Sequence, residues 1–462
     1  MTIAAPRTTP SGTQADSAGE IRTLTGLRIV AAVWVVVFHF HFTSLRGVTE
    51  VVGVLGPLIT SGALGVDLFF VLSGFVIAHT YLATMGPALH LGATARFVWA
   101  RFCRMWPVYA LVFHLFGLWL LARLVLGSDT DIAFQGVQPV LSVGRWVQQV
   151  LMVQMWDDPY LDGASWVGST WSISAEWLAY LLFPAAALVF FRLRNLPVGV
   201  LGAAAVALMV PIATAWVTLG HPYHPWSWAV RILCGFAAGV LVHLVVRRVP
   251  RTAGVRRAAS WTAAVLPVLM AAVLWGGRFV GPGVGGVVIV AFPVLVGALA
   301  LADRGPVALL GRPALVQGGR VSYALYLVHI PVFELFWLAQ AYVPALRGGV
   351  VGHLVGAAVV VLTYPLAAAA FRWVEEPARR RLRALMPPPA ARAGATVPPA
   401  RGATAPSAPP APRHAAGPHR RSTLAALLLD ATPRPAAHRL GDPAVVLERA
   451  ARVRTTGLHA GS

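Results

Sequence analysis

The sequence predicts an all-α fold, a polytopic membrane helix bundle of about ten transmembrane helices with both termini in the cytosol. Of the 462 residues, 57% are hydrophobic and only 12% are charged, and the mean hydropathy is +0.69. Apolar runs of about 20 residues, the length that crosses a bilayer as a helix, recur along the chain. Arginines fall in alternate connections between these runs, as the positive-inside rule expects of a multi-pass protein.

Ten apolar runs account for most of residues 21–385, which we expect to form one transmembrane domain. Their approximate limits are 25–44, 62–82, 105–126, 169–191, 196–218, 227–246, 259–276, 283–302, 321–342 and 350–371. Residues 1–20 are polar and lack an apolar core before a cleavage site, so we expect a disordered cytosolic leader. Residues 386–462 are rich in Pro, Ala and Arg, and we expect a largely disordered cytosolic tail.

The placement of charge sets the expected orientation. All 37 basic residues are arginine, a composition that indicates a GC-rich bacterial genome. With a cytosolic N-terminus, the outer connections would hold little more than Arg46, Arg145, Arg278 and Arg347. We therefore expect a multi-pass protein of the bacterial cytoplasmic (inner) membrane, with the lipid bilayer as its surroundings. The net charge of +20 gathers on no single aromatic-lined face, so no nucleic-acid partner is expected.

Cysteine spacing and loop composition add two expectations. Cys103 and Cys234 lie far apart and show no CxxC or Cys/His spacing, so we expect neither a disulfide nor a metal site. The longest outer connection, residues 127–168, contains a large share of the few acidic residues. It either caps a cavity or is simply a solvated loop.

Ionisable residues inside the apolar runs are the strongest functional signal. Each costs about 2.5 to 3.5 kcal/mol on membrane insertion and persists when it is paired or useful. His39, Asp67 and Glu176 lie on three different spans at a similar expected depth near the outer face. We predict that Asp67 pairs with His39 and orients its ring, so that His39 acts as a general base.

Ordinary structural roles remain open for these residues. A single histidine on an apolar helix is often a hydrogen-bonded core residue. Glu176 could equally be a structural carboxylate bonded to Ser172 or Trp171.

Two further polar groupings stand out. Arg101 and Arg104 are three residues apart, hence on one helical face at the cytosolic mouth, which suits a phosphate or pyrophosphate or, alternatively, lipid headgroups. Tyr323, Tyr326 and His329 form a stripe that either lines a cavity or packs as an aromatic face. Near the end of the last span, Glu375 and Glu376 are expected to form salt bridges with nearby arginines.

Six motifs in this order resemble the acyltransferase-3 family of bacterial integral-membrane O-acyltransferases. They are LTGLRIVAAVWVVVFH, GVDLFFVLSGFVI, RFCRMWPVY, STWSISAEWLAYLLFP, SYALYLVHIPV and FRWVEEPARRRL. The resemblance covers residues 21 to 383. It departs at Thr25, where the family has an acidic residue, and at Ile330, where it has Trp. No fused soluble module is expected.

The resemblance implies transfer of an acyl group from acyl-CoA, which serves as a substrate rather than a permanently bound cofactor, to a hydroxyl-bearing acceptor. Its Arg-x10-His motif maps onto Arg28 and His39, and its Arg-x-x-Arg motif maps onto Arg101 and Arg104. The arginine pair fits recognition of the CoA part of the donor.

The expected mechanism is direct transfer with His39 as general base. Arg28, or a donor from the stretch Trp171 to Ser174, would stabilise the oxyanion. An acyl-enzyme on Ser73, Ser172 or Ser174 is the second route, although these serines lack a nucleophile-elbow pattern.

The acceptor is expected to be a sugar-containing or polyketide, macrolide-type secondary metabolite, as in antibiotic biosynthesis. O-acetylation of a cell-envelope glycan or glycolipid is the alternative. Ten spans with buried charges would also fit a secondary transporter, although no inverted repeat or pair of broken helices supports one.

Overall fold

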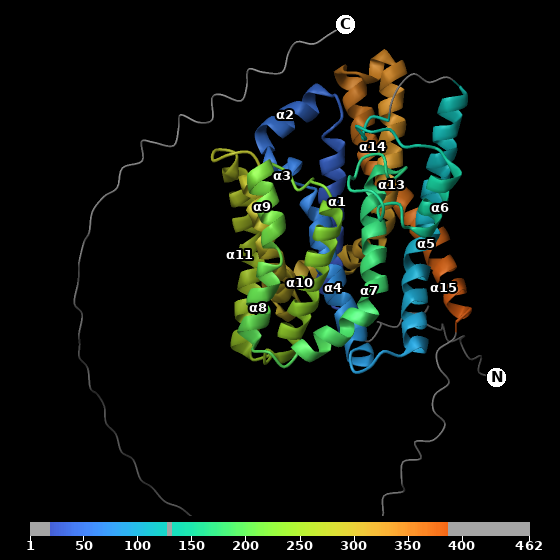
Figure 1. Cartoon of the computed structure of the whole chain (residues 1–462). Helices are drawn as coiled ribbons and strands as arrows, with labels where there is room; N and C mark the ends of the chain where they lie inside the picture. The colour runs from blue at the N-terminus through green and yellow to red at the C-terminus, as the bar shows by residue number, and fades with distance from the viewer. Residues whose placement is uncertain (1–18, 127–131, 387–462) are drawn as a thin grey trace, which may run out of the picture. The chain divides into compact units, whose positions relative to one another are not determined.

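The computed structural model describes residues 19–126 and 132–386, and this part of the chain is helical, with no strand. Ten of its helices are long and apolar enough to cross a membrane, which confirms the expected all-α bundle. Of the leader and tail predicted at residues 1–20 and 386–462, only residues 19, 20 and 386 lie within the described part. Helices α8, α9 and α11 lie on one flank of the bundle and α5 and α15 on the other (Figure 1).

The membrane-spanning segments are single helices in some places and consecutive short ones in others. They are α1 (Arg22–Phe40), α4 (Leu64–Met85), α5 (Leu91–Val125), α7 (Trp171–Leu193), α8 (Val198–Ala207) with α9 (Val210–Leu219), α10 (Ser227–Arg248), α11 (Ala253–Gly277), η2 (Val284–Ala291) with α12 (Phe292–Leu301), α13 (Pro313–Tyr342), and α14 (Gly349–Ala370) with η5 (Phe371–Glu375) and α15 (Glu376–Ala384). The shorter elements are α2 (Arg46–Leu55), α3 (Pro57–Thr60), α6 (Val143–Leu151), η1 (Gly168–Thr170), η3 (Gly305–Gly311) and η4 (Pro344–Leu346).

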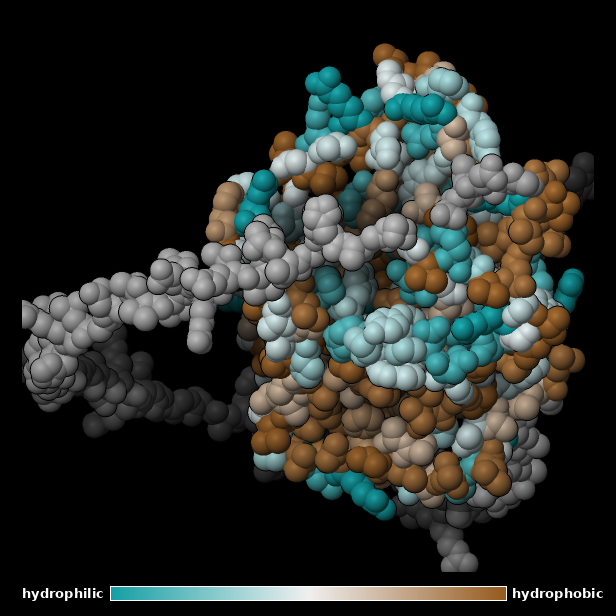
Figure 2. Space-filling view, turned by 45° about the horizontal axis from the view of Figure 1, so that its top comes forward, coloured by the Kyte–Doolittle hydropathy of each residue, from teal (hydrophilic) through white to brown (hydrophobic). Residues whose placement is uncertain are grey.

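The two ends of the bundle differ in composition. We call the end where α1 begins the arginine-rich end; it holds the connections at 86–90, 194–197, 249–252 and 302–312. We call the other the loop-rich end; it holds the connections at 41–63, 132–167, 220–226, 278–283 and 343–348. The loop-rich end is at the top of Figure 1, and Figure 2 is tilted so that this end comes forward. Figure 2 shows apolar flanks and polar residues gathered toward the loop-rich end.

The third span is longer than predicted. It was expected from residue 105, but α5 begins at Leu91, so Arg101 and Arg104 lie inside the helix and not at its start. The flexible arginine side chains permit this, because their heads can reach polar partners while the backbone stays helical. The last span continues through a single π-helical turn, Phe371–Glu375, into α15. Such turns are frequent at functional sites.

Glycines allow two central helix pairs to approach closely. Helix α4 packs extensively against α10, and α1 against α13. A Cβ atom on Gly239 of α10 would overlap the carbonyl oxygen of Val71 on α4, and one on Gly319 of α13 would overlap that of Thr25 on α1. Small residues at such crossings bring backbones together in lipid. The first pair carries Asp67 and the second carries His39.

Adding a methyl group at the α4–α10 crossing tests this packing. We expect Gly239→Ala to lower the free energy of unfolding by about 1–3 kcal/mol, because the backbones must separate. Gly202→Ala on α8, where no atom lies within 4 Å of the new Cβ, is the matched control. It should be neutral or stabilising by up to about 1 kcal/mol through helix propensity. Thermal unfolding in detergent measures both, and equal stability of the two variants would contradict the close crossing.

Candidate active site

Two histidines from different helices meet in the core. His39 is near the end of α1, and its Nδ1 lies 2.9 Å from Nε2 of His329 on α13. Both rings are buried. His39 Nδ1 also lies 3.0 Å from the carbonyl oxygen of Val35, and His329 Nδ1 lies 3.3 Å from that of Leu325. The predicted stripe on α13 thus brings His329 to the candidate base.

The two carbonyl oxygens fix the tautomers of this pair. A carbonyl only accepts hydrogen bonds, so His329 Nδ1 carries a hydrogen and donates to Leu325. The Nε2 atom of neutral His329 then accepts from His39 Nδ1, whose hydrogen is shared with Val35. This leaves the lone pair of neutral His39 on Nε2, and that atom makes no hydrogen bond with the described residues. A lone pair held in this way is what a general base requires.

His39 lines a cavity of about 310 Å³ at the loop-rich end. Its walls are mainly aromatic and come from Phe38, Phe42, Phe134, Tyr160, Trp171, Tyr223 and Tyr326, with polar positions at Gln135, Asp162, His224, Ser227 and Arg231. A second cavity of about 450 Å³ shares Phe38, Ala63 and Tyr223 with it. The first volume lies at the lower edge of the range for small-molecule sites.

The predicted pairing of Asp67 with His39 is wrong. Both carboxylate oxygens of Asp67 accept hydrogen bonds from Arg231 on α10, at 2.8 Å from Nε and 2.9 Å from Nη2. Arg231 Nη2 also donates to the carbonyl oxygen of Ala63. The ion pair is buried, with the two side chains 0% and 1% exposed. A guanidinium out-competes an imidazole here because it is permanently charged and matches a carboxylate with two parallel hydrogen bonds.

Arg231 keeps one unused donor in this cavity. Its Nη1 is buried and has no hydrogen-bond partner among the described residues. Its guanidinium carbon lies 4.8 Å from the ring centre of Trp171 and 5.8 Å from that of Tyr223. A buried donor without a partner is rare and requires an explanation, such as a bound water or a ligand oxygen.

Arg28 and Glu176 lie in a separate, small cavity of about 40 Å³. Arg28 is eleven residues before His39, about 16 Å along the helix axis, so the structure does not bring it to the base. Its guanidinium carbon lies 5.7 Å from the ring centre of Phe69. This cavity shares Val66 and Tyr326 with the larger one, and Ser172 and Tyr323 also line it.

Glu176 takes part in a compact network of its own. Ser73 donates to Glu176 Oε1 at 2.5 Å, and the Tyr180 hydroxyl bonds to both residues. Glu176 is therefore hydrogen-bonded, but not to Ser172 or Trp171 as the structural interpretation expected. The network does not include His39.

The two other candidate serines are also engaged. Ser172 Oγ lies 2.7 Å from the Tyr326 hydroxyl and 3.2 Å from the carbonyl oxygen of Ser169. Ser174 Oγ accepts a hydrogen bond from the backbone N–H of Met155. No imidazole contacts either hydroxyl in the described part of the chain, so neither has the adjacent base that nucleophilic catalysis needs.

Arg101 and Arg104 lie in the half of α5 nearer the arginine-rich end, but they have different surroundings. Arg104 forms an ion pair with buried Glu375, as expected for that carboxylate, and lies over the ring of Tyr323 at 5.2 Å. Arg101 donates to the Tyr81 hydroxyl at 3.2 Å, while its buried Nε has no partner among the described residues.

Two further arginines, Arg379 and Arg383, extend this positive region. They are four apart on one face of α15, and the Trp99 indole of α5 holds this helix by donating to the Leu382 carbonyl at 2.8 Å. Both lie within electrostatic range of Arg101, and neither makes an ion pair within the described residues. Sequence reasoning assigned them no role at the site. Their spacing of four was the available signal.

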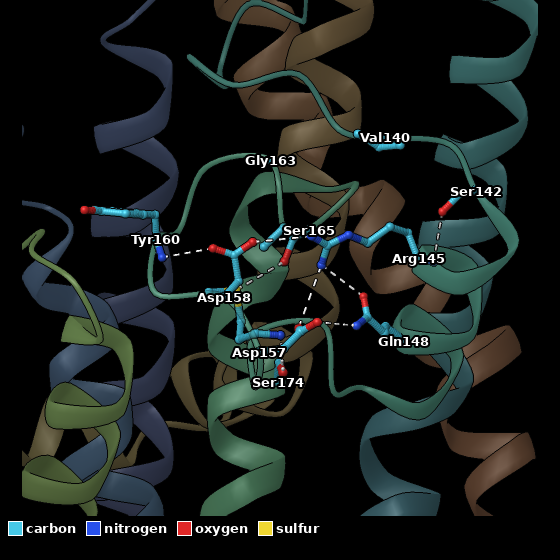
Figure 3. A network of polar contacts seen from close by, with 12 residues as sticks. Val140, Ser142, Arg145, Gln148, Asp157, Asp158, Tyr160, Gly163, Ser165 and Ser174 are labelled. Atoms are coloured by element: carbon cyan, nitrogen blue, oxygen red, sulfur yellow. Dashed lines mark hydrogen bonds and ion pairs between the residues drawn. The ribbon is translucent and has the colours of Figure 1, made fainter.

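The connection between α5 and α7 caps the cavity, so the solvated-loop alternative does not hold for its described part. Phe134 and Gln135 line the cavity from one segment, and Tyr160, Leu161 and Asp162 line it from another. Figure 3 shows the network behind the second segment, in which Arg145 on α6 meets Asp157, Asp158 and Gln148. Partial burial raises the pKa of Asp162.

No metal site accompanies these groups: in residues 19–126 and 132–386, no three His, Cys, Asp or Glu side chains gather in a way that could hold an ion. Sequence reasoning missed Arg231 and Glu334, both ionisable residues inside predicted spans. The rule that singled out His39, Asp67 and Glu176 applied equally to them.

The chain matches the family model of an acyltransferase domain over residues 21–372. It is 30% identical over 355 residues to Acyltransferase MdmB of Streptomyces mycarofaciens, which covers 72% of this chain and 82% of that protein. It is 38% identical over 111 residues to Protein 2 in picA locus of Rhizobium radiobacter, which covers 24% of this chain and 50% of that protein. No solved structure matches the chain. The family model and the first relative each span most of the chain, and together with its ten apolar helices they make this protein a multi-pass membrane member of the acyltransferase-3 family.

Proposed function

We propose that this acyltransferase moves an acyl group from acyl-CoA directly to a hydroxyl of a sugar-containing or macrolide-type secondary metabolite. The observation that carries the proposal is the His39–His329 pair, which leaves the His39 Nε2 lone pair unused at the wall of a ligand-sized cavity. His329 takes the orienting role that the sequence analysis gave to Asp67.

In the proposed reaction, His39 Nε2 removes the proton from the acceptor hydroxyl as its oxygen attacks the thioester carbonyl. The tetrahedral intermediate then collapses, the carbon–sulfur bond breaks, and the imidazolium returns the proton to the departing thiolate of CoA. Arg231 lines the same cavity, and its buried Nη1 would offer a hydrogen bond to an oxygen of a reactant. The positive charge on His39 is transient, so no permanent carboxylate partner is needed.

The donor would bind from the arginine-rich end, which we propose faces the cytosol. Tyr323 connects this end to the interior, because it lies against Arg104 and also lines the small cavity. Tyr326 lines both cavities, and His329 follows three residues later on the same helix. From Tyr323 to His329 the rise is about 9 Å, a distance that the long pantetheine arm of CoA can span.

The acceptor side favours a neutral, oxygen-rich ring system. Aromatic walls stack against the apolar faces of such rings, and the charge of Arg231 is already balanced by Asp67. The two neighbouring cavities of about 310 and 450 Å³ suit a molecule larger than a single sugar. A cell-envelope glycan or glycolipid remains the alternative acceptor, whereas family membership favours the enzyme over the transporter.

Removal of the base is the primary test. We expect His39→Ala to lower acceptor-dependent CoA release by about 10²- to 10⁴-fold, the usual contribution of general-base catalysis. The assay is thiol release from acetyl-, propionyl- and isovaleryl-CoA by detergent-purified protein, with pooled polar-metabolite or envelope extracts. His90→Ala, at an exposed position before α5, is the control and should retain activity. Full activity of a folded His39→Ala variant would eliminate the general-base role.

Asp67 should behave as a structural partner. Asp67→Asn leaves the buried Arg231 charge unpaired and should cost about 3–5 kcal/mol of stability. The double variant Asp67→Leu, Arg231→Met removes both charges and should regain most of that stability in thermal unfolding. An Asp67→Asn protein that unfolds like the parent but loses activity would instead return Asp67 to the catalytic set.

The arginines of α15 should affect donor binding. We expect the double variant Arg379→Gln, Arg383→Gln to raise the KM for acetyl-CoA by about 10-fold, because charge-assisted hydrogen bonds to phosphate are lost. The KM for acetyl-pantetheine, which has no phosphate, should not change. Arg380→Gln with Arg381→Gln on the same helix is the matched control. An equal rise for both thioesters, or an equal effect of the control, would contradict a phosphate contact.

A further inference from the structure

A buried carboxylate on α13 holds the loop that covers His39. Glu334 is 1% exposed and accepts two backbone hydrogen bonds, from Phe134 N–H at 2.9 Å and from Ala133 N–H at 3.1 Å. Each carboxylate oxygen serves one amide. Glu334 lies five residues beyond His329 on the same helix, about 7.5 Å along its axis.

The segment that Glu334 holds is fastened from a second direction. Gln135 donates through Nε2 to the carbonyl oxygens of Ser165 and Trp166, both at 3.1 Å. Its Oε1 accepts a hydrogen bond from Gly163 N–H. The segment 133–135 is therefore tied both to a transmembrane helix and to the other segment of the cap.

Phe134 transmits this restraint to His39. Its ring meets the His39 ring edge-on, with centroids 4.6 Å apart and an interplanar angle of 80°. Phe134 also contacts Phe42, with centroids 5.8 Å apart, and lines the cavity. The orientation of the His39 ring is thus restrained by two contacts: the hydrogen bond from its Nδ1 to His329 and the packing of the Phe134 ring.

We propose that Glu334 is a positioning residue for the general base. Its carboxylate fixes Ala133 and Phe134 so that the Phe134 ring packs against His39 and limits access to Nε2. A carboxylate is suited to this task because it accepts two neighbouring amides at once, and the low dielectric of the bundle strengthens both bonds. Helix α13 then supplies both restraints on the base, through His329 and through Glu334.

The catalytic consequence rests on the proposed function. When Phe134 packs against His39, less of the His39 ring is open to water. Loss of the Glu334 clamp should therefore increase hydrolysis of acyl-CoA relative to transfer. The positioning itself is a property of the protein alone and can be measured without donor or acceptor.

The experiment is carbethoxylation of histidine by diethyl pyrocarbonate, followed by mass spectrometry of each histidine in the full-length protein. The reagent attacks unprotonated imidazole nitrogen, so it reports on His39 Nε2. Exposed His221 is the internal reference. We expect Glu334→Ala to increase the rate at His39 relative to His221 by about tenfold, as loss of charge-assisted hydrogen bonds opens the segment.

Four further variants make the test specific. Phe134→Ala should increase the His39 rate in the same way, and adding Glu334→Ala to it should cause no further increase, because both act through one ring. Glu334→Gln keeps an oxygen for one amide and should give an intermediate rate; it also carries the test if the alanine variant does not fold. Glu50→Gln, at an exposed glutamate paired with Arg46, should leave the rate unchanged.

An unchanged His39 rate in folded Glu334→Ala and Glu334→Gln would overturn the proposal, as would full additivity with Phe134→Ala. If labelling follows the expected pattern but the parent protein releases no CoA with any donor and extract, the positioning stands and the acyl-CoA proposal fails. If CoA release is normal but the labelling of His39 does not change in the Glu334 variants, the acyl-CoA proposal stands and the positioning role of Glu334 fails.

Discussion

The buried ion pair between Asp67 and Arg231 is the interaction on which the arrangement of the central helices depends. Neither charge would be stable alone in the bundle, and removal of one partner of such a pair is far costlier than removal of both. The pair joins α4 to α10, the two helices whose backbones approach closely further along at Gly239 and Val71, so close packing and charge pairing hold the same two helices together. Because Asp67 is paired with Arg231, it does not orient His39. His329 on α13 orients His39 instead.

The other buried carboxylates also have hydrogen-bond or ion-pair partners close by. Glu176 is bonded by Ser73 and Tyr180, Glu375 by Arg104, and Glu334 by two backbone amides. Each carboxylate lies within a small network of its own, so similar depth in the membrane does not mean contact. The groups left with unused capacity are therefore informative. Two of these groups belong to residues that line one cavity: the lone pair of His39 Nε2 and the hydrogen of Arg231 Nη1.

The sequence was sufficient for the number of spans, because apolar length determines it. It could not determine which way a side chain points around its helix axis. For that reason His39 was placed at the correct end, yet given Asp67 in place of His329. Arg28 was grouped with His39 by motif, although eleven residues of helix put them in different cavities. Composition indicated close helix approach, but not which glycines touch which carbonyls. The contact of Phe134 with His39 depends on a long connection whose path no local pattern specifies.

The distribution of charge between the two ends suggests how donor and acceptor would be kept apart. The main cavity is close to neutral in its deep part: Asp67 and Arg231 cancel, and the tautomers of the His39–His329 pair need no added proton. Unpaired guanidinium groups gather at the opposite end, around Arg101, Arg379 and Arg383. The proposed polyanionic donor would be attracted to that end, where its phosphates meet positive charge. In the proposed reaction, its acyl group would pass Tyr323 and Tyr326 to reach His39. A neutral acceptor would enter from the loop-rich end without competing for the arginines.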